Sequence, residues 1–505
     1  MKPVSITPPG RLAALALAAL LAGCSFVPPY QQPAAPIAAQ WPAPSGADPA
    51  GATRAAADLP WQDFVQDPAL RELVALALQN NRDLRVAVQN IEQARAQYQI
   101  QRSNLLPTLA GSLSEQRTVP NASADANGQP KVSSLYTLGV GISSWELDFF
   151  GRVAALKDVA LSSYLATEEA LKTTQMSLIA NVIAAGLQLK TDTELLGLAE
   201  RTLATREQSL QLTQLRLDHG AATALDQQLA QSQVANAQAA RAQQQRLRAQ
   251  DINALTLLVG QPLPERLLPA VPAAVAPAPQ PDLAQLAPVP APVAALPAFA
   301  PVPAGLPSDL LLRRPDIRAA EQQLIGANAN IGAARANFFP RITLTASVGR
   351  VSTDLDGLLG SGGTGAWSFA PSISLPIFDG GRNQANLDVA KAGRAIAVAQ
   401  YEKAIQSAFR EVADALAGRA TLAAQLDALQ AQATAERERY RLTELRYRNG
   451  VASHLDLLDA QRSLFAIEQA LAQGQLAERN NEVLLYKALG GGWSEPAPAT
   501  AAAAS

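Results

Sequence analysis

Several side chains of this sequence that could do chemistry lie in a short stretch that occurs twice. Thr223 is followed three residues later by Asp226, and Ser453 is followed three residues later by Asp456. A hydroxyl residue with a carboxylate three positions on is the pattern of a capping box, which starts a helix. The same carboxylates could instead form a charged gate. A cap explains both copies, so we predict capping roles for Thr223, Asp226, Ser453 and Asp456.

A glycine precedes each of these pairs by three residues, at Gly220 and Gly450. Glycine is preferred just after a helix because it adopts the left-handed conformation without strain. Each copy therefore predicts a tight turn between two helices. The tips of the two turns are formed by Gly220, Ala221, Ala222, Gly450, Val451 and Ala452.

One acidic residue near these turns occurs in the second copy only. Asp459 lies four residues after Leu455, on the same helix face, and the equivalent position in the first copy is Leu229. Tyr447, just before the second turn, is likewise replaced by Leu217 in the first copy. An acidic residue that breaks the repeat is either a pore-lining group or a solvated charge on a helix. Both interpretations of Asp459 stay open on the sequence alone.

The sequence gives little indication of catalysis, of a bound cofactor or of nucleic-acid binding. The two histidines, His219 and His454, lie at the predicted turns, and no HExxH, GxSxG or Walker-type pattern is present. The net charge is −2, and no basic stripe with interleaved aromatic residues suggests nucleic-acid binding. We therefore predict a protein that is not an enzyme and that uses no cofactor or metal.

The N-terminus is typical of an exported lipoprotein. A basic start and a short apolar run predict a signal peptide over 1–23, and the only cysteine, Cys24, ends the sequence "LAGC". This resembles a bacterial lipobox, so we predict that Cys24 carries the lipid. An ordinary signal peptide with an incidental cysteine is the alternative. Later apolar runs are too short for a membrane helix, so any span must be made of strands.

The chain is a duplication of about half its length. Residues 83–107 align without a gap on residues 316–340, and later positions, such as Arg152 and Arg382, match as well. Dense proline between the copies predicts an extended linker. The predicted segments are an N-terminal anchor segment (24–60), a first repeat (61–261), a Pro/Ala-rich linker (262–307), a second repeat (308–493) and a disordered tail (494–505).

Each repeat is predicted to contain a helix, two strands and two long helices. Apolar and small or polar residues alternate in the strands, which is typical of a membrane barrel but also of a soluble antiparallel sheet. Aromatic residues at the strand ends favour the membrane. The strands are predicted over 108–118, 133–145, 341–350 and 366–377, and the long helices over 151–219, 223–259, 381–448 and 453–489.

The long helices carry apolar residues at intervals of seven, which predicts coiled coils. In the helix over 151–219 the stripe consists of Val182, Leu189, Leu196, Leu203, Leu210 and Leu217. In the last helix it consists of Leu457, Ala460, Leu464, Ile467 and Leu471. A purely structural coiled-coil lipoprotein would explain these helices and Cys24, but not four barrel-like strands.

The repeat plan, the lipobox and three local sequences together resemble one known family. The sequences are "GLPSDLLLRRPDIRAAE" (305–321), "ANFFP" (336–340) and "LRYRNGVASHLDLLDAQRSL" (445–464). They are similar to the TolC-type outer-membrane efflux channels, and in particular to the lipoprotein subgroup called NodT-type or OprM-like. The resemblance covers nearly the whole chain after residue 24.

The resemblance implies a mainly helical fold with membrane β-structure, assembled as a homotrimer. Each protomer would give four strands to a twelve-stranded outer-membrane barrel, and the helices would form a periplasmic coiled-coil tunnel. It also implies passive export of drugs or other small molecules. The partners would be a periplasmic adaptor protein, an inner-membrane pump of the RND type and outer-membrane lipid.

The resemblance further implies where the channel closes. The constriction residues of the lipoprotein subgroup match Arg446, Tyr447, Leu455 and Asp459, and adaptor hairpins would touch the turn tips named above. Three copies of Leu455 would form an apolar ring that blocks flow by dewetting, and three copies of Asp459 an acidic ring that favours cations. Crowded carboxylates are expected to have raised pKa values. A channel for protein secretion or for metal ions is an alternative within the family.

Overall fold

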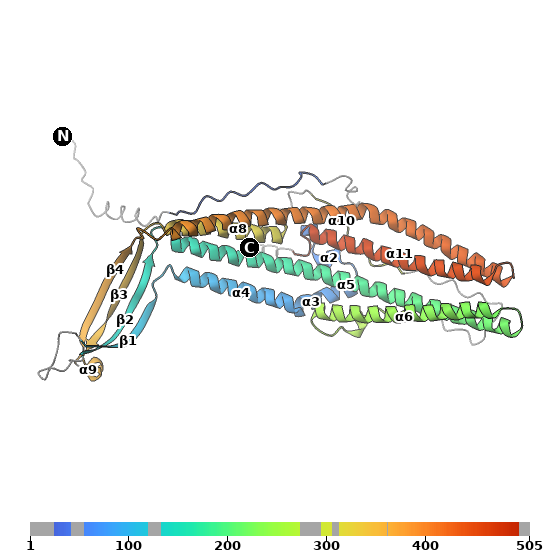
Figure 1. The fold of residues 1–505 in the computed structure, drawn as a ribbon, viewed down its shortest axis with the longest axis horizontal. Coiled ribbons are helices and arrows are strands. Elements are labelled where there is room, and N and C mark those ends of the chain that lie inside the picture. The colour runs from blue at the N-terminus through green and yellow to red at the C-terminus, as the bar shows by residue number, and fades with distance from the viewer. Residues whose placement is uncertain are drawn as a thin grey trace, which may run out of the picture. The chain divides into compact units, whose positions relative to one another are not determined.

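The computed structural model describes residues 25–41, 55–119, 133–272, 294–305, 313–360 and 362–493. The predicted signal peptide (1–23), the lipid site at Cys24 and the tail (494–505) lie outside these residues, as does much of the linker. The chain divides into two compact units. The first holds the strands, and the second holds most of the long helices (Figure 1).

The first unit is built on a four-stranded antiparallel sheet with strand order β1-β2-β3-β4. Because the order follows the chain, β1 and β4 are the two edges of the sheet (Figure 1). A short helix, α9, lies in the connection between β3 and β4. The bounds are β1 Leu109–Thr118, β2 Ser133–Leu147, β3 Arg341–Ser352, α9 Leu355–Leu359 and β4 Thr364–Ser374.

One face of this sheet is apolar and exposed. Val140 on β2 pairs with Val348 on β3, which pairs with Trp367 on β4, so the three side chains share a face. They are 43%, 65% and 79% exposed, respectively. A half-buried soluble sheet would cover such a face, whereas a sheet in a bilayer turns it to lipid. The exposure therefore favours the membrane interpretation of the strands.

A β-bulge near the end of β2 changes which side chains face which side. Ile142 pairs with Ala346, but Trp145 pairs with Leu344, so β2 has one residue more than β3 at this point. Ser144, inside the bulge, has a positive φ of 53°. As a consequence Trp145 returns to the apolar face, and Glu146 lies on the opposite one.

Strand β4 is shorter than predicted. It ends at Ser374, so Leu375 and Ile377, which we expected inside the strand, lie beyond it. Pro376 lacks the N–H that a ladder needs, which explains the early end. Pro371 also lies inside β4, which is an edge strand in the sheet of a single protomer.

The N-terminal residues of the first unit lie against its helices. Phe26 stacks on Phe339 with 4.4 Å between ring centroids. The Asn328 side chain, on α8 (Pro315–Ala336), donates a hydrogen bond to the Pro28 carbonyl at 2.7 Å. The Tyr30 hydroxyl donates to Glu321 on the same helix at 3.0 Å. These contacts fix the residues that follow position 24 along α8.

The second unit is helical. Helices α4, α5, α8 and α10 have residues in both units, and the remaining helices here belong to the second. No helix among the described residues combines the length and hydropathy needed to cross a membrane. The bounds are η1 Ala56–Asp58, α2 Trp61–Phe64, α3 Pro68–Asn80, α4 Arg82–Ser103, α5 Arg152–Asp218, α6 Ala224–Val259, η2 Glu265–Leu267, α10 Arg382–Arg448 and α11 His454–Ala488.

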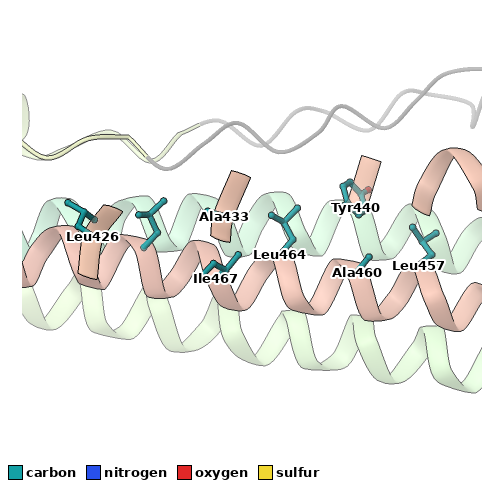
Figure 2. Packing of buried hydrophobic residues seen from close by; sticks show 8 residues of the cluster. Leu426, Ala433, Tyr440, Leu457, Ala460, Leu464 and Ile467 are labelled. Atoms are coloured by element: carbon teal, nitrogen blue, oxygen red, sulfur yellow. The ribbon is translucent and has the colours of Figure 1, made fainter. Parts of the chain in front are cut away.

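Helices α10 and α11 pack along one apolar seam (Figure 2). The α10 side repeats every seven residues through Leu426, Ala433 and Tyr440, all buried. This spacing is the heptad of a coiled coil. The stripe predicted for the last helix is confirmed, because each of its residues is buried: Leu457, Ala460, Leu464, Ile467 and Leu471.

The predicted stripe on α5 is buried over most of its length. Val182, Leu189, Leu196 and Leu203 are at most 5% exposed, and Leu210 packs beside the Leu203 cluster. That cluster also holds Val234 of α6, so the second helix of each repeat returns against the first. The two helix pairs, α5–α6 and α10–α11, thus follow the same plan (Figure 1).

Candidate functional site

Both helix pairs end in the same kind of turn. The N–H of Gly220 bonds to the Leu217 carbonyl at 2.9 Å, and the N–H of Ala221 bonds to the Arg216 carbonyl at 2.7 Å. This pair of hydrogen bonds is a Schellman motif, which satisfies the last carbonyls of a helix. The second turn repeats it, with Gly450 bonded to Tyr447 at 3.0 Å. The two glycines have φ values of 72° and 74°, in the left-handed region.

Complete capping boxes start both return helices. The Asp226 N–H donates to the Thr223 hydroxyl at 3.2 Å, and the Thr223 N–H donates to the Asp226 carboxylate at 2.9 Å. Ser453 and Asp456 make the same two bonds, at 3.1 and 2.9 Å. Each carboxylate therefore accepts a hydrogen bond from a backbone N–H of its own turn. Hydrogen bonds from the cap hold the pKa of both Asp side chains below the ordinary value.

We expect Gly450→Val to lower the free energy of unfolding by about 1–2 kcal/mol, because a branched side chain is strained at positive φ. No described atom lies within 4 Å of a Cβ built at Gly450, so the backbone is the only source of the cost. Gly450→Asn is the matched control, since Asn tolerates this conformation best. Denaturant unfolding of the two variants checks this. Equal losses would mean that the left-handed backbone is not the cause.

The gate candidates surround the second turn. Leu455 is 65% exposed, and Arg446 is exposed at the end of α10. Asp459, four residues after Leu455, is held by two arginines. Its carboxylate accepts from Arg439 of α10 at 2.5 Å and from Arg462 at 2.6 Å. An apolar side chain and a charge-compensated carboxylate therefore lie one turn apart on α11.

Within one protomer the pKa of Asp459 lies below its ordinary value. The hydrogen bond from Arg439 and the charges of Arg439 and Arg462 lower this pKa. The predicted rise of this pKa concerns three copies of Asp459 crowded in one ring, so it stays a prediction for the assembled channel. Within the protomer the charge of Asp459 is balanced by Arg439 and Arg462.

Tyr447 joins the two helix pairs. Its hydroxyl accepts a hydrogen bond from Arg216 of α5 at 2.6 Å, and the guanidinium carbon lies 4.7 Å from the centre of its ring. His454, the first residue of α11, packs against the same ring at 5.6 Å. Burial, together with the charge of Arg216, lowers the pKa of His454 below its ordinary value despite the opposing effect of Asp226. The imidazole is therefore neutral at pH 7.

Sequence reasoning did not find every residue of this arrangement. Arg462 could have been found, because it follows Asp459 by three residues on one helix. Arg439 and Arg216 could not, since their partners lie on other helices. His454 had been noted only for its place at the turn.

A sheet with an exposed apolar face, followed by long helix pairs that end in matched turns, defines the protomer of a membrane channel. A family model described as "Outer membrane efflux protein" matches residues 73–261 and 306–491. The chain belongs to this family and is located in the outer membrane. The predictions of a mainly helical fold with membrane strands and of an efflux channel are confirmed. The family description is that of an efflux protein rather than of an enzyme.

Individual relatives cover almost the whole chain. Two proteins of Pseudomonas putida, the antibiotic efflux pump outer membrane protein ArpC and the toluene efflux pump outer membrane protein TtgC, are each 47% identical over 94% of both chains. The sequence of the Neisseria gonorrhoeae MtrE outer membrane channel, known from an open-state crystal structure, is 42% identical to this chain. It covers 93% of this chain and 99% of its own, with a TM-score of 0.80.

Proposed function

We propose that this protein is the outer-membrane channel of a tripartite efflux system and works as a homotrimer. An inner-membrane pump of the RND type would supply the energy, and a periplasmic adaptor would bridge the pump to the tips of the helix pairs. The relatives named for antibiotic and toluene efflux support organic small molecules as the cargo. Lipidation at Cys24 would add an anchor to the strands.

The open four-stranded sheet is the observation that supports a trimer. Among the described residues, β1 and β4 each have no neighbouring strand on one side. Unpaired strand edges are not tolerated in lipid, and four strands are too few to close a barrel. Three copies, each joining β4 to the β1 of the next, give twelve strands and remove every edge.

Native mass spectrometry of the protein extracted from outer membranes tests this assembly. We expect one species containing three protomers, each beginning at a lipidated Cys24. A monomeric species that stays folded would contradict the closed barrel. Trimers without lipid would remove only the anchor from the proposal.

The gate is the second part of the proposed function. Arg446, Tyr447, Leu455 and Asp459 surround the second turn, and Leu455 projects from it. Three copies of the exposed Leu455 form the apolar constriction, and the Arg439–Asp459–Arg462 cluster holds α10 and α11 together beside it. The Arg216–Tyr447 contact holds the second turn against the first helix pair.

Replacing Leu455 and Asp459 together with Ala should raise the resting conductance of the protein in planar bilayers by at least several-fold. The apolar ring and the ion pairs of Asp459 with Arg439 and Arg462 are lost at once. The first repeat provides a matched control, because Leu225 and Leu229 occupy the equivalent positions and Leu225 is 69% exposed. Leu225→Ala with Leu229→Ala should leave the conductance unchanged. Equal effects of the two pairs would exclude a gate specific to the second turn.

A further inference from the structure

The two outer strands of the sheet are joined to the long helices by short connections. Helix α4 leads into β1 through residues 104–108, and β4 leads into α10 through residues 375–381. Neighbouring strands of the sheet are antiparallel, so β1 begins and β4 ends at the same end of the sheet (Figure 1). The two connections therefore lie at opposite edges of one end of the sheet.

Both connections expose large apolar side chains in the single protomer. After β4, Ile377 is 94% exposed and Phe378 is 92% exposed, and Leu375 is half-exposed. Before β1, Leu106 is 69% exposed, and Leu109, the first residue of the strand, is 70% exposed. Apolar side chains grouped and exposed in this way mark a contact with a partner or with a membrane.

The two surfaces are also free of charge. No Asp, Glu, Lys or Arg occurs over residues 103–114 or over residues 363–378. The two segments can therefore cover each other without burying an unpaired charge. Each connection contains a proline, at Pro107 and Pro376, which restricts the backbone before any contact forms.

The trimer proposed above brings the two connections together. It pairs β4 of one copy with β1 of the next, and this pairing is antiparallel like those inside the sheet. In an antiparallel pair, the residues just after one strand lie beside the residues just before the other. Paired strands are about 5 Å apart, which is within reach of Leu, Ile and Phe side chains. A shift of the register by two residues keeps residues 375–378 beside residues 105–109.

We propose that residues 375–378 of one copy pack against residues 105–109 of the next copy and form an apolar contact between protomers at this end of the barrel. The inference rests on the proposed trimer and goes beyond it, because the strand itself ends at Ser374. The contact covers Ile377 and Phe378, the two most exposed large apolar side chains among the described residues. Lipid is the other occupant that such side chains could meet, and the experiment separates the two.

Cross-linking of introduced cysteines in intact outer membranes tests the contact. In the full-length protein, Leu106→Cys combined with Ile377→Cys should give covalent trimers on a denaturing gel after treatment with a short bismaleimide, because each copy is linked to both neighbours. Each single variant should stay monomeric, and it also controls for the chain's own Cys24. Leu106→Cys with Phe378→Cys is a second pair that samples the same contact while Ile377 is unchanged.

Leu106→Cys with Trp367→Cys is the matched control pair. Trp367 is also apolar and 79% exposed, but it precedes Ile377 by ten residues, or about 30 Å of extended chain. This pair should give no covalent trimers, and equal cross-linking of both pairs would contradict the contact. If native mass spectrometry shows trimers that do not cross-link, the contact is wrong and the trimer stands. If it shows monomers only, the trimer itself is wrong.

The heat stability of the trimer in SDS gives a second test. Ile377→Ser combined with Phe378→Ser should lower the dissociation temperature by at least several degrees, because the apolar contact between copies is lost. Leu359→Ser is the control, since Leu359 is 73% exposed but lies on α9, between β3 and β4 at the other end of the sheet. An unchanged dissociation temperature of the double variant would overturn the contact.

Discussion

Phe64→Ala is expected to lower the free energy of unfolding of the helical unit by about 3–5 kcal/mol. Phe64 is fully buried, and its ring stacks on Tyr486 of α11 at 4.0 Å and on Phe299 at 4.9 Å. Deleting it leaves a cavity among three chain segments and removes two stacking contacts. Denaturant unfolding followed by the helical circular dichroism signal measures the loss.

Tyr486→Phe is the matched control for this substitution. It keeps the ring stack but removes the hydroxyl, which donates to the Leu59 carbonyl at 2.6 Å. A single buried hydrogen bond is worth about 1–2 kcal/mol, so the loss should be clearly smaller than for Phe64→Ala. Equal losses would show that the hydrogen bond, rather than the stack, holds this region together.

Asp251→Asn is expected to stabilise the protein at pH 8 and to have little effect near pH 4. Burial, together with the adjacent carboxyl of Asp192, raises the pKa of Asp251 to about 7. Asp192 is 4% exposed, and the two side chains join α5 to α6. The folded state therefore keeps a proton on Asp251 that the unfolded state has already lost between about pH 4 and 7.

The sign of the pH dependence follows from that proton. A raised pKa of an acid gives stability that is fully present below pH 4 and lost as the pH rises through 7. Asn mimics the protonated carboxyl at every pH, so the melting temperature of the variant should rise above that of the wild type from about pH 4, and the difference should be complete above about pH 7. Asp427→Asn, at an exposed position, should show no such difference. A difference that is the same at pH 4 and pH 8 would contradict the shared proton.

The local features of this fold could be predicted from the sequence because their signals are local. The turns at Gly220 and Gly450 were predictable because a left-handed glycine and a capping box each need only a few neighbouring residues. The long helices could be predicted from the absence of proline and from their seven-residue stripes. The end of β4 was missed because alternation continues past Ser374, while Pro376 breaks the ladder.

The features that join distant segments could not be predicted in this way. The Arg216–Tyr447 contact links residues 231 positions apart, and no periodicity records it. The bulge at Ser144 is hidden because residues on either side of it still alternate. The Asp459 pairing needed both helices of the second repeat to be placed before Arg439 could be identified as its partner.

The contacts of Phe26, Pro28 and Tyr30 with α8 and Phe339 have a mechanical consequence for a lipid attached at Cys24. Two residues of extended chain span only about 7 Å. The attachment point of a lipid at position 24 would therefore lie within about that distance of Phe26, which stacks on Phe339. Phe339 directly precedes Pro340 and the start of β3. Such a lipid would limit movement of the sheet along the membrane normal, because the acyl chains would have to move with it.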